Sequence, residues 1–183
     1  MRELSLHFLD IITNSIKADA KNIRFYIIVK DNVLNMEIID DGKGMSEEFL
    51  EKVVDPFKTT RTTRNIGMGI PLLKQAAEAA GGKFKIESTL GKGTTVKASF
   101  ILKHIDRAPL GNLADALIPV ISENFDFFMH YEVDGEIFIF DTKEIKKMLD
   151  GVPIDSQEIL AYLNGYLADN IKNINGGKIL WNQ

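Results

Sequence analysis

The 183-residue sequence contains no cysteine. This absence excludes disulfides, thiolate nucleophiles and cysteine-ligated metal sites together. The sequence also lacks an apolar run of membrane-spanning length, and its opening MRELSLHFLD carries acids and does not have the pattern of a signal peptide. We therefore expect a cytoplasmic protein with no membrane partner.

An excess of basic residues is absent as well. The chain has 22 basic and 26 acidic residues, which gives a formal net charge of -4. A broad basic surface is therefore not expected, and neither is nucleic acid as a partner. The composition, 45% hydrophobic and 26% charged, is that of a globular protein, and the length suits one domain plus a small additional unit.

The spacing of apolar residues predicts a layered α/β domain in residues 1–104. Apolar residues at helical spacing predict helices at 2–18, from Ser46 onward and at 70–80, and alternating patterns predict strands at 22–30, 33–40, 83–88 and 94–102. This order of helices and hairpins predicts an α+β two-layer sandwich with a mixed, mostly antiparallel sheet.

The pattern restarts after residue 104, which predicts a second, small α+β unit at 105–183. We expect helices at 112–123 and 156–174, and a hairpin at 126–140 with Asp134-Gly135 at its turn. Asp141 and Glu144 occupy positions that resemble a capping box at the start of a further helix. Its aromatic residues are interpreted as a core, and we find no motif that assigns this unit a role: Phe125, Phe127, Phe128, Tyr131, Phe138 and Phe140.

The segment LDIITNSIKADA places polar residues on one side of the first predicted helix. Asp10, Asn14 and Lys17 are separated by four and three residues, and His7 lies on the same polar stripe. An asparagine oxygen suits magnesium, a lysine one turn away suits a phosphate, and an aspartate can orient or deprotonate water. Taken alone, such a stripe is more typical of the solvent-facing side of a helix, and we interpret His7 as a surface or second-shell residue.

Three further segments have chemistry of interest. In DDGKGM an acid precedes two glycines, which suits a tight loop against a flat ligand such as adenine, although a simple turn has the same pattern. GMGIPLL leads into a helix, whose free amide hydrogens form a phosphate site. Between them, PFKTTRTTR carries Lys58, Arg61 and Arg64, which suit either a solvated loop or a lid over a polyphosphate.

In this order and spacing, the segments resemble the boxes of the GHKL ATPase superfamily of gyrase, heat-shock chaperone, histidine kinase and mismatch-repair type, and most resemble the histidine-kinase-like domain. DIITNSIKADA resembles the N-box, DDGKGM the first glycine box, DPFKTT the F-box, GMGIPLLKQAAEAAGG the second glycine box and GKGTTVKASF the closing strand. The resemblance spans residues 1 to about 103. It implies a Bergerat fold that binds ATP and Mg2+.

The resemblance also implies roles for individual residues. Asn14 matches the magnesium-coordinating asparagine, Asp40 the adenine-binding aspartate, and Thr94 the threonine that supports this aspartate, with Thr95 the less favoured choice. Lys17 matches a lysine that faces the phosphates in the histidine-kinase branch. The remaining ATP-site residues expected from the boxes are Gly42, Gly44, Met45, Phe57, Lys58, Thr59, Gly67, Met68, Gly69 and Ile70.

One departure from the superfamily bears on turnover. Hydrolysing branches have glutamate four residues before the asparagine, where this chain has Asp10, a shorter candidate base. A misplacement of about 1 Å can cost about a hundredfold in rate, so hydrolysis is expected to be slow or absent.

The sequence leaves several functions open. Only thirteen residues precede Asn14, so we expect no phosphoacceptor hairpin before the ATP domain, and His104 and His130 are interpreted as structural. We expect a histidine-kinase-like ATP-binding protein that regulates a partner through lid closure or phosphorylates it in trans. The alternatives are a slow ATPase coupled to dimer closure and a non-hydrolysing interaction module.

Overall fold

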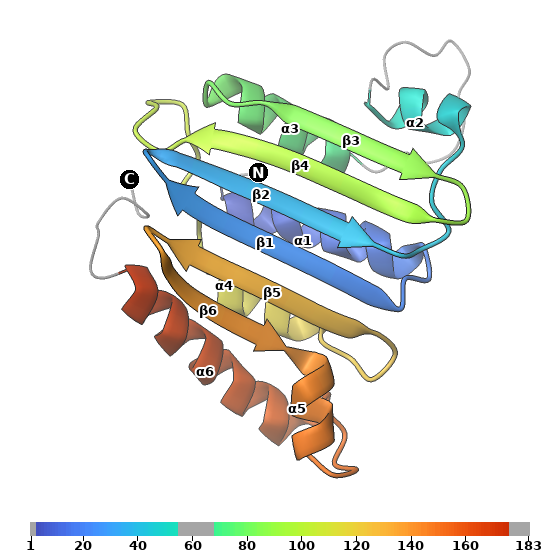
Figure 1. Ribbon diagram of the computed structural model, residues 1–183, viewed down its shortest axis with the longest axis vertical. Coiled ribbons are helices and arrows are strands. Elements are labelled where there is room, and N and C mark those ends of the chain that lie inside the picture. The colour runs from blue at the N-terminus through green and yellow to red at the C-terminus, as the bar shows by residue number, and fades with distance from the viewer. Residues whose placement is uncertain (1–2, 55–67, 176–183) are drawn as a thin grey trace.

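The computed structural model of the chain describes residues 3–54 and 68–175 and forms a sheet with helices packed on it (Figure 1). The elements are, in chain order, α1 Leu4–Lys17, β1 Asn22–Lys30, β2 Val33–Asp40, α2 Glu47–Val54, α3 Gly69–Ala79, β3 Phe84–Thr89, β4 Gly93–Ile101, α4 Leu113–Leu117, the 3-10 helix η2 Ile118–Val120, β5 Asp126–Val133, β6 Glu136–Asp141, α5 Thr142–Met148 and α6 Gln157–Asn175. Among the described helices, none is both long and apolar enough to cross a membrane.

The six strands form one sheet in the order β3-β4-β2-β1-β5-β6. Four neighbouring pairs are antiparallel, while β1 and β5 are parallel, with Phe25 opposite Met129. The predicted mixed, mostly antiparallel α+β architecture is therefore confirmed. Strands from both sides of residue 104 belong to this sheet, because the hairpin β5–β6 pairs with β1.

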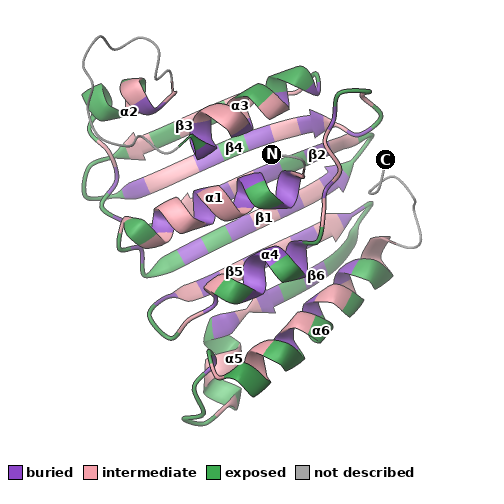
Figure 2. Cartoon of the chain, turned by 180° about the vertical axis from the view of Figure 1, so that it is seen from behind, coloured by how far each residue is buried: buried purple, intermediate pink, exposed green. Residues whose placement is uncertain are grey.

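The helices cover one face of the sheet, with α1 between α3 and α4 (Figure 2). The apolar side of α1 is buried against the strands, as its spacing predicts. Phe8 of α1 packs edge-to-face on Phe25 and Phe100, with ring centroids 5.5 and 6.3 Å apart. This packing fixes the helix relative to β1 and β4, which matters for the cavity described below.

The segment after β4 closes the start of α1. The first helical amides have no partner within a helix, and those of Leu4 and Ser5 donate to the carbonyl oxygens of Pro109 and Leu110 at 2.9 and 2.8 Å. The buried guanidinium of Arg107 holds this segment by donating to the carbonyl oxygens of Leu102 and Ala108 at 2.6 and 2.8 Å. The N-terminal helix therefore depends on residues beyond β4 for its cap.

The helix predicted at 112–123 is shorter than expected. It comprises α4 and the three-residue η2, after which Ile121 is extended. Pro119 accounts for the difference, because it has no amide hydrogen to continue an α-helical ladder. Asn112 accepts a hydrogen bond from the Asp115 amide and so caps the N-terminus of α4.

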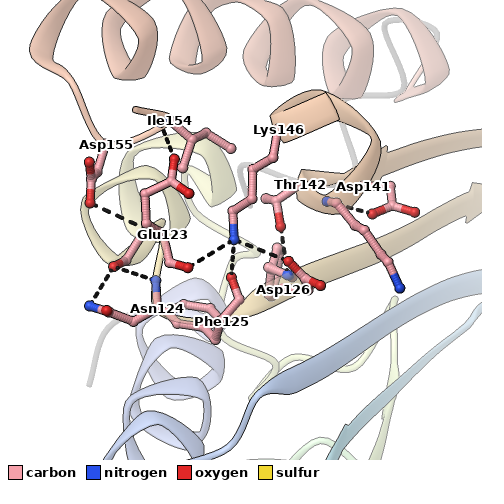
Figure 3. Close-up of polar contacts among 12 residues, drawn as sticks. Glu123, Asn124, Phe125, Asp126, Asp141, Thr142, Lys146, Ile154 and Asp155 are labelled. Atoms are coloured by element: carbon pink, nitrogen blue, oxygen red, sulfur yellow. Dashed lines mark hydrogen bonds and ion pairs between the residues drawn. The ribbon is translucent and has the colours of Figure 1, made fainter. Parts of the chain in front are cut away.

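A partly buried lysine joins α5 to the segment before β5 (Figure 3). The ammonium group of Lys146 donates to the carbonyl oxygens of Phe125 and Glu123 at 2.6 and 3.3 Å, and it pairs with a carboxylate oxygen of Asp126 at 3.1 Å. Its side chain is 18% exposed. Lys146 therefore fills several acceptor sites that β5 and its preceding loop leave unpaired.

The aromatic residues of the second segment contribute to the core, with one exception. Phe125, Phe127, Tyr131, Phe138 and Phe140 are buried, as expected from the sequence. Phe128 lies instead on the face of the sheet without helices, where its ring centroid is 5.9 Å from that of Tyr26. The difference follows from strand alternation, because Phe127 and Phe128 must point to opposite faces.

Candidate functional site

A cavity of about 410 Å³ lies between α1, α2, the start of α3 and the adjoining ends of β2 and β4. It is lined by seven of the residues expected from the sequence: Asn14, Lys17, Asp40, Gly44, Met45, Ile70 and Thr94. Seven others also line it: Ile11, Ser15, Ala18, Lys43, Phe49, Val53 and Val96. The lining combines apolar side chains with a few polar groups, as is typical of small-molecule sites.

Asp40 is the buried acid of this cavity. It is the last residue of β2 and is 8% exposed. One carboxylate oxygen accepts a hydrogen bond from the Ser15 hydroxyl at 2.7 Å, and the other accepts from the Gly42 amide at 2.9 Å. Both oxygens are therefore fixed in place, and their remaining lone pairs are available to a donor in the cavity.

Thr94 lies directly opposite Asp40 in the pairing of β4 with β2. Directly opposed residues share a face of the sheet, so Thr94 lies on the helix-covered face, where it lines the cavity. Thr95 is paired with Ile39 and lies on the other face. Of the two threonines considered from the sequence, the structure therefore brings Thr94 and not Thr95 to the acid.

Ser88 connects three parts of the site, although sequence reasoning did not single it out. Its hydroxyl oxygen accepts a hydrogen bond from the Met45 amide at 2.9 Å, and its hydrogen is donated to the Gly93 carbonyl oxygen at 3.0 Å. The Thr94 hydroxyl is also 2.9 Å away. Because one hydroxyl has a single hydrogen, Thr94 is then the donor in that bond and keeps its lone pairs for the cavity.

The two glycines of the loop after β2 allow close approach of backbone to backbone. A β-carbon on Gly42 would lie 2.8 Å from the Ala18 carbonyl oxygen, and one on Gly44 would lie 2.1 Å from the Thr89 carbonyl oxygen. Gly44 also has φ +63, a backbone conformation that residues other than glycine adopt only with steric strain. The loop therefore fits against α1 and the β3–β4 turn only with glycine at these positions.

Asn14 and Lys17 of α1 reach the cavity, as their position on one side of the helix predicts. Asn14 is partly buried and Lys17 is exposed, and both line the cavity. Ser15 is 2% exposed and lies on the sheet-facing side of the helix among apolar residues. A polar residue within an apolar stripe is the signal from which its bond to Asp40 could have been suspected.

Asp10 does not line the cavity but contacts the first residue of α3. A β-carbon on Gly69 would lie 2.9 Å from the β-carbon of Asp10, so the two helices nearly touch at this point. Partial burial raises the pKa of Asp10, and the positive charge of Lys17 offsets part of that effect. Asp10 is thus a stronger base than an exposed aspartate.

Of the two interpretations of His7 from the sequence, that of a surface residue is wrong. The side chain is 3% exposed, and its Nδ1 atom has no hydrogen-bond partner among the described residues. His7 lies one turn before Asp10, on the side of α1 against which α3 packs, so the neighbouring helix covers part of the expected polar stripe. Burial lowers the pKa of His7 to about 4.

The other expected residues divide into two groups. Gly42, Met68 and Gly69 are described but do not line the cavity, since Gly42 packs on Ala18, Met68 is 49% exposed and Gly69 packs on Asp10. Phe57, Lys58, Thr59 and Gly67, together with the cationic residues Arg61 and Arg64, lie outside the described residues.

The arrangement suits a ligand with a flat polar ring and an anionic end. Asp40 offers fixed acceptors at one part of the cavity, and Lys17 and Asn14 offer a cation and an amide at another. No cluster of three or more His, Asp and Glu side chains able to hold a metal occurs in the described residues. A Mg2+ ion here would take most of its oxygens from the ligand and water, with Asn14 as the candidate protein ligand.

Comparison with known proteins agrees with this geometry. The model of the family "Histidine kinase-, DNA gyrase B-, and HSP90-like ATPase" matches residues 2–104. The histidine protein kinase DivJ of Caulobacter vibrioides is 32% identical over 101 residues, which are 52% of this chain and 17% of that protein. The signal transduction histidine-protein kinase ArlS of Staphylococcus aureus is 34% identical over 100 residues, 51% of this chain and 22% of that protein.

A solved structure supports the fold. It is the N-terminal domain of a DNA repair protein, and the alignment covers 76% of this chain and 52% of the solved chain. The TM-score is 0.52 and the sequence identity is 18%. The chain spans about a fifth of the length of the two kinases. From the matched family model and the site it covers, the chain belongs to the family of histidine kinase-, DNA gyrase B- and HSP90-like ATPases.

Proposed function

We propose that the cavity binds ATP with Mg2+, and that the chain acts as a histidine-kinase-like module on a partner protein. The observation that carries this proposal is the fixed carboxylate of Asp40, which accepts from Ser15 and Gly42 at 2.7 and 2.9 Å on the cavity wall. A buried carboxylate with spare lone pairs matches the exocyclic amine of adenine and disfavours a ring that presents a carbonyl oxygen there. Family membership implies ATP binding independently.

The remaining residues fit the rest of the nucleotide. Ile11, Met45, Ile70 and Val96 give the cavity apolar walls for the flat faces of a base. Lys17 would neutralise phosphate charge, and Asn14 would hold the ion through its amide oxygen. When bound, Mg2+ supplies charge neutralisation at the phosphates, and the chain supplies orientation.

The proposed action on a partner has two forms, which are regulation through nucleotide-dependent lid closure and transfer of a phosphoryl group in trans. Both are supported by the two relatives, which are histidine kinases. A slow ATPase coupled to dimer closure is the second candidate, favoured by Asp10, whose carboxyl group lies beside the start of α3 and has a raised pKa. A module that binds ATP without hydrolysis is the third.

Calorimetry with a matched pair of variants tests the site. Asp40→Asn keeps the size of the side chain but replaces one acceptor with a donor, so we expect ATP affinity to fall about a hundredfold, the loss expected for a charged hydrogen bond and its mismatch. Asp41→Asn is the control, because Asp41 is exposed and its carboxylate accepts from Lys21 and Asn22 rather than lining the cavity. Equal affinities of Asp40→Asn and the unchanged chain would exclude this site.

Incubation with ATP labelled at the γ-phosphate distinguishes the proposed actions. The chain is incubated alone and with candidate partner proteins. Label on a partner indicates transfer in trans, released phosphate indicates an ATPase, and bound intact ATP indicates a regulatory module. We expect transfer or intact ATP rather than rapid release, because the base at position 10 is shorter than the superfamily's glutamate.

A further inference from the structure

The strand β6 forms one edge of the sheet, and α6 runs beside it (Figure 1). Its residues on the uncovered face are Ile137 and Ile139, which are 53% and 51% exposed, and Asp141 at its end. The other edge strand, β3, has Lys85 and Glu87 at the corresponding positions, paired at 2.9 Å. Exposed apolar edge strands are prone to pair with another chain, whereas charged side chains discourage such pairing. The exposed isoleucines therefore make β6, rather than β3, the candidate interaction surface.

The backbone of β6 is available for such pairing. The turn before it has Asp134 and Gly135 at φ 51 and 91, the positive values of a two-residue hairpin turn. The flanking residues Val133 and Glu136 are then a hydrogen-bonded pair, and the pairs alternate along the strand. The amide and carbonyl groups of Ile137 and Ile139 therefore point away from β5, and no other described strand pairs with β6.

A groove of about 610 Å³ runs beside this edge between β6, α5 and α6. Its lining is mostly apolar and includes Ile139, Met148 and Ile159. Tyr162 and Tyr166 of α6 are 69% and 41% exposed, and their rings stack with centroids 6.4 Å apart and an interplanar angle of 9°. Exposed, parallel aromatic rings beside a free strand offer one wall for the side chains of an added strand.

Acidic residues outnumber basic residues in the segment that forms much of the groove. Among the described residues, the charged ones that line it are Asp141 and Glu144, and Glu144 is paired with the exposed Lys147 at 2.7 Å. Residues 134–158 contain seven acidic and three basic residues, and the basic Lys146 is turned inward to Asp126. Basic groups on an occupant would complement this surface, whereas acidic groups would be repelled.

We propose that β6 and this groove bind an extended, basic and apolar peptide segment of a partner protein as an additional strand. Its alternate side chains would contact Ile137 and Ile139 on one face, and Met148, Tyr162 and Tyr166 on the other. Pairing of β6 with a second copy is disfavoured, because it would bring two acidic 134–158 segments together. The site lies at the sheet edge, two strands beyond β1, and uses none of the residues that line the ATP cavity.

A synthetic peptide tests the proposal with the full chain. The probe is fluorescein-labelled Lys-Val-Lys-Ile-Lys-Val, whose length matches the six residues of β6, and Glu-Val-Glu-Ile-Glu-Val is its acidic counterpart. Fluorescence anisotropy measures binding, and hydrogen exchange reports on the amides of Ile137 and Ile139. We expect the basic peptide to bind, to slow exchange at both amides, and to bind less tightly as salt is added.

Two substitutions of exposed isoleucines provide the matched comparison. Ile139→Lys places a positive charge in the groove and should weaken binding of the basic peptide by about tenfold or more. Ile105→Lys changes a residue that is 94% exposed and does not line the groove, and it should leave binding unchanged. Because both positions are exposed, neither change should prevent folding.

Three results would overturn the proposal. The first is absence of binding by the basic peptide, or equal binding by both isoleucine variants. The second is binding without protection of the β6 amides. The third is protection of these amides in the free chain, in which case sedimentation velocity would tell a dimer from coverage by the chain itself. ATP binding does not enter this test, so its outcome is independent of the proposed function.

Discussion

At the residue scale, Asp10 is the candidate base for any turnover of bound ATP. Its pKa is raised by burial, with Lys17 offsetting part of the rise, so a base at this position loses its charge at a higher pH than an exposed aspartate. We expect any hydrolysis to decline as the pH is lowered through this raised pKa. Asp10→Asn should abolish phosphate release while calorimetry still shows ATP binding, and unchanged release would exclude Asp10 as the base.

Asp10→Glu extends the same comparison. The added methylene restores the length of the superfamily's glutamate, and the proximity of Gly69 leaves little room for it to turn toward α3. We expect a rise in phosphate release of about tenfold or more, since small errors of position have large effects on rate. A rate equal to that of the unchanged chain would show that reach does not limit turnover.

His7 gives a prediction about stability and pH. Its pKa is lowered by burial from 6.5 to about 4, so below about pH 6.5 the unfolded chain binds a proton that the folded chain does not. The free energy of unfolding should therefore fall as the pH decreases from 6.5 to about 4, by an amount on the order of 1–3 kcal/mol. Urea unfolding at several pH values measures this fall, and His7→Leu should flatten it. The same slope in both proteins would contradict the assignment.

The role of a site residue could be predicted from the sequence where a motif requires a particular residue type. It could not be predicted where the role depends on a contact made only in the folded chain. Asn14, Lys17 and Asp40 follow from residue type and spacing, and all three line the cavity. Ser15 stands next to Asn14, yet its role depends on its hydroxyl facing Asp40 across 25 residues of chain. His7 has the spacing of an exposed residue and is buried because a second helix packs beside it.

At the element scale, the β3–β4 hairpin supports the loop after β2. The loop rests on this hairpin through the Met45 amide, which donates to Ser88, and through the Gly91 amide, which donates to the Lys43 carbonyl oxygen at 2.7 Å. Gly93 allows the same approach, because a β-carbon there would lie 1.9 Å from the Asp40 carbonyl oxygen. The geometry of the candidate ATP site therefore depends on a hairpin that contributes few of its lining residues.

This dependence predicts a loss of ATP affinity on Ser88→Ala. Removal of the hydroxyl leaves the Met45 amide and the Thr94 hydroxyl without their shared partner, at a cost of about 1–2 kcal/mol, so affinity measured by calorimetry should fall about tenfold. Ser99→Ala is the matched control, because Ser99 accepts from the Lys83 amide at 2.9 Å near the opposite end of β4. Equal losses in the two variants would indicate general destabilisation instead.

Individual helices and strands were easier to predict than the way in which the strands pair in the sheet. The alternation of apolar and polar residues predicts β1, β2 and the β5–β6 hairpin, and Asp134-Gly135 predicts the turn of this hairpin. Nothing in the alternation of residues 22–30 indicates that 126–133 pairs with them in parallel, because the faces of a strand are encoded in its residue order but its neighbours are not. The pattern of apolar residues at 112–123 predicts a longer helix than the structure has, because the pattern does not show that Pro119 ends the α-helical ladder.

At the scale of the whole molecule, the parts on either side of residue 104 share a sheet and a helix cap. β5 pairs with β1 along its length, and the carbonyl oxygens of Pro109 and Leu110 accept from the first amides of α1. α1 in turn carries Ser15, which holds Asp40. A disturbance in the C-terminal part should therefore reduce the stability of the ATP cavity, since the same strands and helix serve both.

Lys146 provides the test of this coupling. Lys146→Met keeps the length of the side chain but removes its bonds to Phe125, Glu123 and Asp126, and the acceptors left in a partly buried site should lower the free energy of unfolding by about 2–4 kcal/mol. Lys147→Met is the control, because Lys147 is exposed and pairs at 2.7 Å with the exposed Glu144. This substitution should change the free energy of unfolding by less than about 1 kcal/mol. Hydrogen exchange under mild urea reports β2 and β5 separately, and we expect Lys146→Met to accelerate exchange equally in both strands. Acceleration confined to β5 would mean that the C-terminal part unfolds alone and that a partner held at β6 could not influence the ATP cavity through the sheet.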